Sequence, residues 1–249
     1  YGSFARRIMS WLGNHVGLIT VRDEGSLGEL AALNITKPHI EVTADPVLAI
    51  HPVDKGIGRT ILKAYDADGA KPIVGISVRE WRAWKHYKEV IAQAADAIAS
   101  ELGARVVFLP MQYPEDVKVA ESIAARTKEK TIVLNDEYAT SELLSIVGNM
   151  DLLIGVRLHA LIFAGVMGVP MIGISYDPKV DRFLNSIGEK VVGDLKNVTV
   201  EGLMVEVREK WNDKAMFRKR NTALLAGLRT AASHNAELAL GLVYKQEEK

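Results

Sequence analysis

Several apolar segments of this chain are followed by polar side chains that could bind an anion and move a proton. Arg79 follows the apolar stretch at 72–78, and Arg157 and His159 follow the stretch at 151–154. A guanidinium group pairs with carboxylates and phosphates through several N–H donors. A histidine can act as a general acid or base near neutral pH. These residue types predict a site that holds a small anion beside an imidazole.

The stretch from 151 to 180 predicts how these side chains are positioned. It reads as a short apolar strand, a turn, the apolar helix LHALIFAGVM and a second apolar strand after Gly168. The strands of such a βαβ unit lie side by side in a parallel sheet, and ligands bind beyond their carboxyl ends. Because the turn opens a helix, its free backbone N–H groups and its dipole also favour an anion.

The same alternation of strands and helices runs through residues 72–211, which is typical of a parallel α/β sheet. We therefore expect one edge of this sheet to collect polar residues from several strands. They are Ser77, Arg79, Gln112, Arg157, His159, Ser175, Tyr176, Asp177 and Lys179.

Structural roles stay open for some of these residues. Arg79 could pair with Glu80 or with Asp151. His159 taken alone would fit a capped position in the core. Asp177 could serve only as the N-cap of a helix that begins at the following proline.

The order of elements predicts two Rossmann-like domains with parallel sheets. Residues 1–49 contain two strands, which bury too little apolar surface to form a domain; we expect them to be the C-terminal part of an incomplete N-terminal domain. Asp45 ends its second strand. We expect a linker at 50–70, a C-terminal Rossmann-like domain at 71–212, and a helical segment at 213–249 that packs back toward the N-terminal domain.

Two further expectations concern residues 1–49. Ser26 followed by Glu29 is a capping-box pattern, which predicts a helix starting at Ser26. As an alternative to a separate domain, the segment could pack as an extension on the residues that follow it.

Composition excludes several classes of protein. Lys and Arg total 31, as do Asp and Glu, so no net charge attracts nucleic acid. With no cysteine, and histidines that lack metal-ligand spacing, we expect no metal site. No glycine-rich phosphate loop or Gly-x-Ser-x-Gly elbow occurs. No apolar run is long enough to span a bilayer, so we expect a cytoplasmic protein.

The segment GVRLHALIFAGVMGVPMIGISYDPKVDRFL, with LITVRDEGS, VTADP, GISVR, PMQYPEDV and GNMDLLIG, resembles the polysaccharide pyruvyl transferase family, closest to its bacterial CsaB branch. Members of that family normally begin with a segment containing Gly-Asn-x-Gly-Asp, which is not found here. The chain therefore resembles about the last two-thirds of a family member.

The resemblance implies a GT-B-like fold and the transfer of pyruvate from phosphoenolpyruvate onto two hydroxyls of a sugar, with no cofactor. In the CsaB branch the acceptor is N-acetylmannosamine in a lipid-linked precursor of the secondary cell-wall polysaccharide, and the product anchors S-layer proteins. At most peripheral contact with the inner face of the membrane is implied. The family's phosphoenolpyruvate-binding positions correspond to Arg79, Arg157, Leu158 and His159. The arginines and the histidine are the expected catalytic residues, and we add Ser77 and Lys179 as binding residues and Gln112, Tyr176, Asp177 and Asp45 as candidate substrate contacts.

Two other functions remain open. The first alternative is a GT-B glycosyltransferase, which would bind a sugar nucleotide at the same edge of the sheet, usually with a carboxylate that accepts hydrogen bonds from the ribose hydroxyls. The second alternative is an inactive fragment that binds phosphoenolpyruvate but does not catalyse the transfer.

Overall fold

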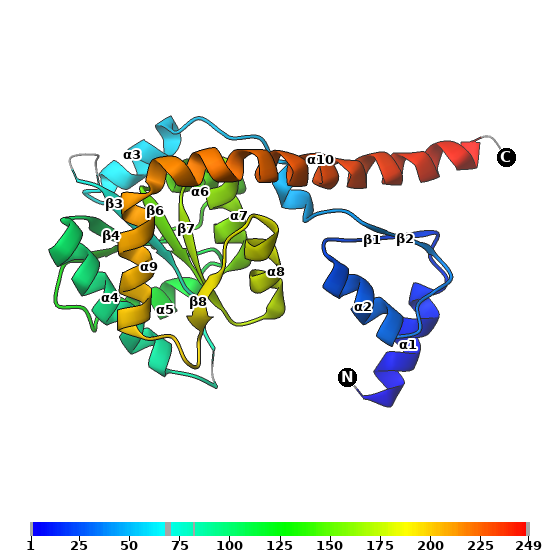
Figure 1. Cartoon of the computed structure of the whole chain (residues 1–249), viewed down its shortest axis with the longest axis horizontal. Coiled ribbons are helices and arrows are strands. Elements are labelled where there is room, and N and C mark those ends of the chain that lie inside the picture. The colour runs from blue at the N-terminus through cyan, green and yellow to red at the C-terminus, as the bar shows by residue number, and fades with distance from the viewer. Residues whose placement is uncertain (1, 68–70, 82, 248–249) are drawn as a thin grey trace. The chain divides into compact units, whose positions relative to one another are not determined.

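The computed structural model describes residues 2–67, 71–81 and 83–247, which form an α/β fold with parallel sheets (Figure 1). The chain separates into two compact units. The smaller unit comprises Tyr1–His51 and Leu224–Lys249, and the larger unit comprises Pro52–Ala223. Because the last helix, α10 (Lys214–Glu247), spans residue 224, it supplies residues to both units.

The smaller unit contains a two-stranded parallel sheet flanked by helices. Its elements besides α10 are α1 (Ser3–Gly13), β1 (Leu18–Val21), α2 (Glu24–Ala32), β2 (His39–Val42) and the 3-10 helix η1 (Pro46–Ala49). The two strands pair in parallel register from Leu18 opposite His39 to Val21 opposite Val42. Two strands joined through a helix are the pattern expected for residues 1–49.

The start of α2 differs from the sequence expectation. Asp23, in extended conformation, is the N-cap residue, and its Oδ1 accepts a hydrogen bond from the Ser26 backbone N–H at 2.7 Å. Ser26 therefore donates to the cap from inside the helix and is not the cap itself. The expectation of a capping box at Ser26 is wrong because aspartate, an equally good capping residue, comes three positions earlier.

The second half of α10 is fixed to the end of β2 within the smaller unit. The Thr43 hydroxyl donates to Asn235 Oδ1 at 2.9 Å, and Asn235 Nδ2 donates to the Ala44 carbonyl at 3.1 Å. One asparagine thus pairs with both of the residues that directly follow β2.

The larger unit is built on a six-stranded sheet with strand order β5-β4-β3-β6-β7-β8, and all neighbouring strands are parallel. The strands are β3 (Ile73–Ser77), β4 (Arg105–Phe108), β5 (Thr131–Val133), β6 (Leu152–Gly155), β7 (Met171–Ser175) and β8 (Val191–Asp194). The helices are α3 (Gly56–Ala64), α4 (His86–Leu102), α5 (Glu115–Ala124), α6 (Thr140–Gly148), α7 (Leu158–Met167), α8 (Pro178–Ser186) and α9 (Val200–Asn212). The strands expected at 72–78 and 151–154 and the helix LHALIFAGVM are confirmed as β3, β6 and α7, and strands and helices alternate through residues 72–211 as expected.

Alternate residues of each strand face opposite layers of helices. Val74, Ile76 and Val78 belong to a buried cluster shared with α4, α5 and α9. The opposite face meets the layer of α6, α7 and α8 and carries glycines where these helices approach: a Cβ built on Gly155 would lie 2.7 Å from Leu161. Both faces of the sheet are therefore covered, as its near-continuous apolar strands predict.

A close approach between α3 and α6 gives a first testable prediction. The Gly58 N–H donates to Ser145 Oγ at 2.7 Å, and a Cβ on Gly58 would lie 2.3 Å from backbone atoms of Ser145. Gly58→Ala should lower the free energy of unfolding by about 3 kcal/mol, because the backbones must separate. Gly28→Ala is the matched control: Gly28 lies in α2 with nothing near its Cβ position, so the change should stabilise its helix by about 0.5–1 kcal/mol. Calorimetric melting of both variants checks the opposite signs, and a neutral Gly58→Ala would contradict this account.

The first half of α10 is tied to the larger unit by a buried ionic cluster. Glu189 is 5% exposed and accepts hydrogen bonds from Lys210, and from Arg220 at 2.9 Å. Asn221, which is fully buried, donates to the Ile187 carbonyl at 3.0 Å. These contacts fix α9 and α10 to the turn between α8 and β8.

None of the helices in the described part of the chain has the length and apolar character needed to cross a membrane.

Candidate functional site

The carboxyl edge of the larger sheet has a topological switch point between β3 and β6. The chain leaves β3 toward β4 on one side and leaves β6 toward β7 on the other. In open parallel sheets, ligands bind in the crevice outside such a point. Ser77 ends β3 and pairs in register with Gly155 at the end of β6. Residues just after these two strands therefore lie at the position where this fold is expected to bind a ligand.

Ser77, the last residue of β3, has a buried hydroxyl group. The residue is fully buried, and its Oγ has no hydrogen-bond partner among the described residues. A buried polar atom without a partner is costly, so such atoms in folded proteins usually meet a ligand or a water molecule. Ser77 was a predicted binding residue, and its environment is consistent with that role.

Arg79 follows β3 and packs against aromatic rings. Its guanidinium carbon lies 4.5 Å from the centroid of the Tyr176 ring and 5.6 Å from that of Trp81. Tyr176 follows β7, so the contact links two of the predicted site residues. Cation–π contacts of this kind orient the plane of a guanidinium while leaving its N–H groups free to donate.

The backbone of Arg79 is held as well. The buried Tyr87 hydroxyl donates to the Arg79 carbonyl at 2.6 Å, and burial raises the pKa of Tyr87, which keeps this donor protonated. Arg79 Nε is buried and has no partner among the described residues. The pairing with Glu80 considered from the sequence is not formed, because Glu80 accepts from Lys88 at 2.7 Å.

Asp151 is also engaged elsewhere: it accepts from the Ile73 N–H at 3.0 Å and from Lys214 Nζ at 3.3 Å. Both structural alternatives for Arg79 are therefore wrong. No carboxylate among the described residues is found paired with Arg79.

Arg157, the N-cap residue of α7, is held by a residue that the sequence reasoning missed. Its Nε donates to Asp116 Oδ2 at 3.0 Å and its Nη2 to Asp116 Oδ1 at 2.5 Å. Nη2 also donates to Gln112 Oε1 at 3.0 Å. The Nε–Nη2 edge of Arg157 therefore already binds a carboxylate within the protein. The only signal in the sequence was an aspartate in the first turn of the helix after β4.

His159 lies in the first turn of α7, next to buried Leu158. It is exposed, and no hydrogen bond to it is found within the described ranges, 2–67, 71–81 and 83–247. The alternative of a capped core histidine is wrong for this reason. No side chain caps α7, so the first backbone N–H groups of the helix remain available to an anion. The imidazole is thus free to meet a ligand at the helix start.

The residues after β7 combine structural and site roles. Asp177 caps α8: its Oδ1 accepts from the Lys179 N–H at 3.1 Å. Lys179 Nζ lies 5.1 Å from the centroid of the Tyr176 ring and 3.8 Å from Asp177 Oδ2. The N-cap interpretation of Asp177 is confirmed. Lys179 is placed beside the ring that also contacts Arg79.

Asp45 belongs to the smaller unit. It caps η1 through the Val47 N–H at 3.2 Å and accepts from Arg22 Nη1, also at 3.2 Å. Its role as a substrate contact stays a prediction. In the part of the chain that the structure describes, no three histidine, aspartate or glutamate side chains are arranged to hold a metal ion.

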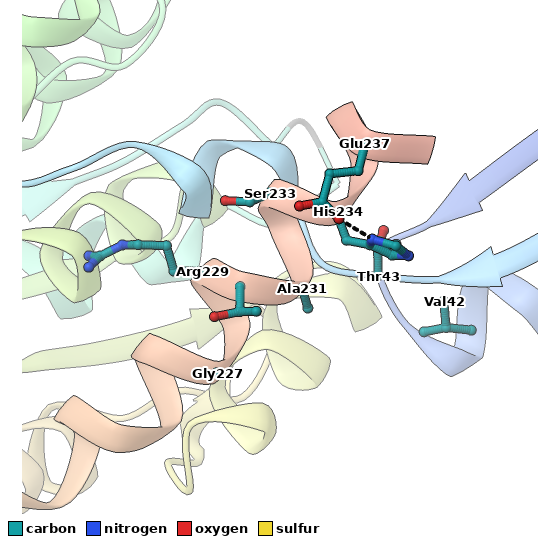
Figure 2. A pocket seen from close by; sticks show the side chains of 9 residues that line it. Val42, Thr43, Gly227, Arg229, Ala231, Ser233, His234 and Glu237 are labelled. Atoms are coloured by element: carbon teal, nitrogen blue, oxygen red, sulfur yellow. Dashed lines mark hydrogen bonds and ion pairs between the residues drawn. The ribbon is translucent and has the colours of Figure 1, made fainter. Parts of the chain in front are cut away.

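The smaller unit contains a cavity of about 540 Å³ that the sequence did not indicate (Figure 2). Val42 and Thr43 line it at the end of β2, and the remaining lining residues come from α10: Gly227, Arg229, Thr230, Ala231, Ser233, His234 and Glu237. Figure 2 shows the Arg229 side chain extending away from His234. The imidazole Nδ1 of His234 lies 2.7 Å from Glu237 Oε2, and its Nε2 lies 3.1 Å from Glu41 Oε1.

These carboxylates make His234 sensitive to pH. The hydrogen bond with Glu237, and then the charge of Glu41, raise the pKa of His234. A raised pKa in the folded state means that the ion pairs stabilise the unit at low pH and are lost as the pH rises through that pKa. Proton NMR titration of His234 should give a higher midpoint in the wild type than in Glu237→Gln. Equal midpoints would show that Glu237 does not stabilise the imidazolium.

Solved structures share this fold at low sequence identity. Staphylococcus aureus MnaA in complex with UDP has a TM-score of 0.68 and 14% identity over 90% of this chain and 60% of that protein. UDP-GlcNAc 2-epimerase from Neisseria meningitidis, bound to UDP-GlcNAc, has a TM-score of 0.67 and 13% identity over 94% and 63%. Anabaena Alr3699/HepE in complex with UDP-glucose has a TM-score of 0.62 and 13% identity over 98% and 68%.

The predicted fold class is confirmed, because epimerases and glycosyltransferases of this kind have the GT-B fold. The chain spans about three-fifths of the length of the first two of these proteins. A comparison with curated proteins finds no match.

Residues 1–178 match the family described as polysaccharide pyruvyl transferase. The matched region includes β3, the β4–α5 turn and the β6–α7 turn, and therefore Arg79, Asp116, Arg157 and His159. By this match over most of its length, the chain belongs to the polysaccharide pyruvyl transferase family.

Proposed function

We propose that this chain carries the donor site of an enzyme that transfers a pyruvyl group from phosphoenolpyruvate onto two hydroxyls of a sugar. The proposed acceptor, as in the CsaB branch, is N-acetylmannosamine in a lipid-linked precursor of the secondary cell-wall polysaccharide. The pyruvylated polymer would then anchor S-layer proteins. The reaction would take place in the cytoplasm, at the inner face of the membrane where the lipid-linked acceptor is found.

The observation that carries this proposal is the arrangement at the switch point between β3 and β6. On the β3 side are the unsatisfied Ser77 hydroxyl and the stacked guanidinium of Arg79. On the β6 side are the uncapped N-terminus of α7 and the exposed imidazole of His159. Phosphoenolpyruvate has one phosphate and one carboxylate, so it requires donors from two directions and a group that transfers a proton.

The reaction needs few components beyond these. Protonation of the methylene carbon of phosphoenolpyruvate makes C2 electrophilic, and a sugar hydroxyl adds to it and loses its proton. The C2–O bond to phosphate then breaks and inorganic phosphate leaves with the bonding electrons. A second hydroxyl adds to C2, loses its proton and closes the cyclic ketal.

The protonation of phosphoenolpyruvate and the departure of phosphate have candidate groups in this chain. His159 would deliver a proton to the methylene carbon or to the departing phosphate. Arg79, the N–H groups at the start of α7 and the remaining Nη1 of Arg157 would stabilise the phosphate as its charge increases. Lys179 and Ser77 would add donors at the edge of the same crevice.

Turnover measured with competing donors tests the proposal. The protein is incubated with a lipid-linked N-acetylmannosamine acceptor and either phosphoenolpyruvate or a sugar nucleotide, and products are detected by mass spectrometry and phosphate release. We expect a pyruvyl ketal and phosphate from phosphoenolpyruvate alone. Transfer of a sugar would instead indicate a GT-B glycosyltransferase. Phosphoenolpyruvate binding without turnover would indicate that this chain supplies only the donor site.

A further inference from the structure

We infer that Asp116 is a positioning residue of the donor site, acting through Arg157. This inference rests on the proposed function for the identity of the ligand. Asp116 is fully buried in the first turn of α5 and was not among the residues expected to act in the reaction.

The carboxylate of Asp116 joins two loops of the sheet edge. Its Oδ2 accepts from the backbone N–H groups of Met111 at 3.1 Å and Gln112 at 3.0 Å, in the loop after β4. Both of its oxygens also accept from Arg157, which follows β6 and lies 41 residues further along the chain. β4 and β6 are the two neighbours of β3 in the sheet. The ion pair therefore links the loops on either side of the strand that delivers Ser77 and Arg79.

This contact determines which donors of Arg157 can reach a ligand. A guanidinium has five N–H groups, one on Nε and two on each Nη. Nε donates once, to Asp116, and Nη2 donates to Asp116 and to Gln112. Nη1 is the nitrogen left without a partner among the described residues. Because 18% of the Arg157 side chain is exposed, Nη1 is the donor group that we expect a ligand to meet.

The charge of Asp116 alone would have the opposite effect on binding. A carboxylate beside Arg157 weakens the attraction of the guanidinium for an anionic ligand. If charge alone set the affinity of the site, the carboxylate of Asp116 would therefore lower it. The buried carboxylate of Asp116 accepts four hydrogen bonds and restricts the conformations of the Arg157 side chain before a ligand binds. We therefore expect orientation to outweigh the lost attraction.

Calorimetric titration of a double-mutant cycle tests this inference. Asparagine at position 116 would direct an NH₂ group at N–H donors that now meet a carboxylate oxygen. Asp116→Asn should weaken phosphoenolpyruvate binding about 10-fold in the wild-type background. In the Arg157→Ala background, the same change should have an effect of less than about two-fold, because a residue that acts through Arg157 has no further effect once Arg157 is removed.

A matched control separates positioning from general stability. Glu189→Gln also removes a buried carboxylate that pairs with basic residues of the larger unit, so it should lower the melting temperature but leave phosphoenolpyruvate affinity unchanged. If Asp116→Asn does not fold, Gln112→Ala removes one exposed acceptor of Arg157 and should weaken binding about two- to three-fold, again only when Arg157 is present.

Parallel titrations with inorganic phosphate and a UDP-sugar distinguish failure of this inference from failure of the proposed function. The same non-additive pattern with one of these anions, and no binding of phosphoenolpyruvate, would support the role of Asp116 and reject the proposed donor. Unchanged or tighter binding in Asp116→Asn, full additivity with Arg157→Ala, or no binding of any of the three anions would overturn the inference.

Discussion

Replacement of His159 by glutamine should lower turnover with phosphoenolpyruvate by about 100-fold or more, the usual range for losing a general acid or base. His159 lies exposed in the first turn of α7, beside the uncapped helix N-terminus. Glutamine keeps a hydrogen-bond donor at this position but has no proton to transfer. Phosphoenolpyruvate affinity should therefore change much less than the turnover number.

The measurement is turnover against pH for the wild type, His159→Gln and a control. His39→Gln is the matched control, since His39 is also exposed but begins β2 in the smaller unit and contacts Glu41. We expect the control to keep the wild-type rate, and the variant to lose the limb of the pH profile that depends on the imidazole. A variant that turns over near the wild-type rate would show that His159 only positions the ligand, and the proton would then have to come from another group.

Replacement of Arg79 by alanine should weaken phosphoenolpyruvate binding by about 2–5 kcal/mol, the range for losing one partner of a desolvated charged pair. The Arg79 guanidinium is oriented by the Tyr176 and Trp81 rings and takes neither of the carboxylates considered as its partners. Its N–H groups are thus free to bind the ligand. Arg79→Lys should restore little of the affinity, because an ammonium has no planar fork to stack and donate at once.

Calorimetric titration of Arg79→Ala, with Arg208→Ala as control, decides this point. Arg208 is an arginine of the same unit whose guanidinium binds Glu101 at 2.9 Å on the exposed surface. Its loss should leave affinity unchanged and alter stability little. If Arg79→Ala binds phosphoenolpyruvate as tightly as the wild type, Arg79 has only a packing role beside the aromatic rings.

The edge of the sheet where the site lies was predictable because it depends on local patterns. Apolar segments alternating with helices indicate a parallel sheet, and parallel strands end at one edge. Arg79 and His159 were therefore expected at the same edge before any contact was known. The N-cap at Asp177 was predictable for a similar reason, since capping involves residues two or three positions apart.

The partners of the arginines could not be predicted in this way. Arg157 meets Asp116 across 41 residues, and nothing in the spacing favours this carboxylate over the others that follow strands. Arg79 lies against the ring of Tyr176, which follows a strand two places away in the sheet. These choices depend on the order of the strands and on the path of each loop.

Hydrophobic periodicity and strand direction act over a few residues, so the sequence alone predicted an α/β fold with arginines and a histidine at one edge of its sheet. Which of these side chains have partners within the protein depends on contacts between loops that are distant in the sequence. One edge of the Arg157 guanidinium binds Asp116, and His159 is exposed. Arg79 lies against the Tyr176 ring and pairs with no carboxylate in the described part of the chain. The sequence did not predict these contacts because hydrogen bonds and ring contacts between loops depend on distances in space, which separation along the chain does not specify.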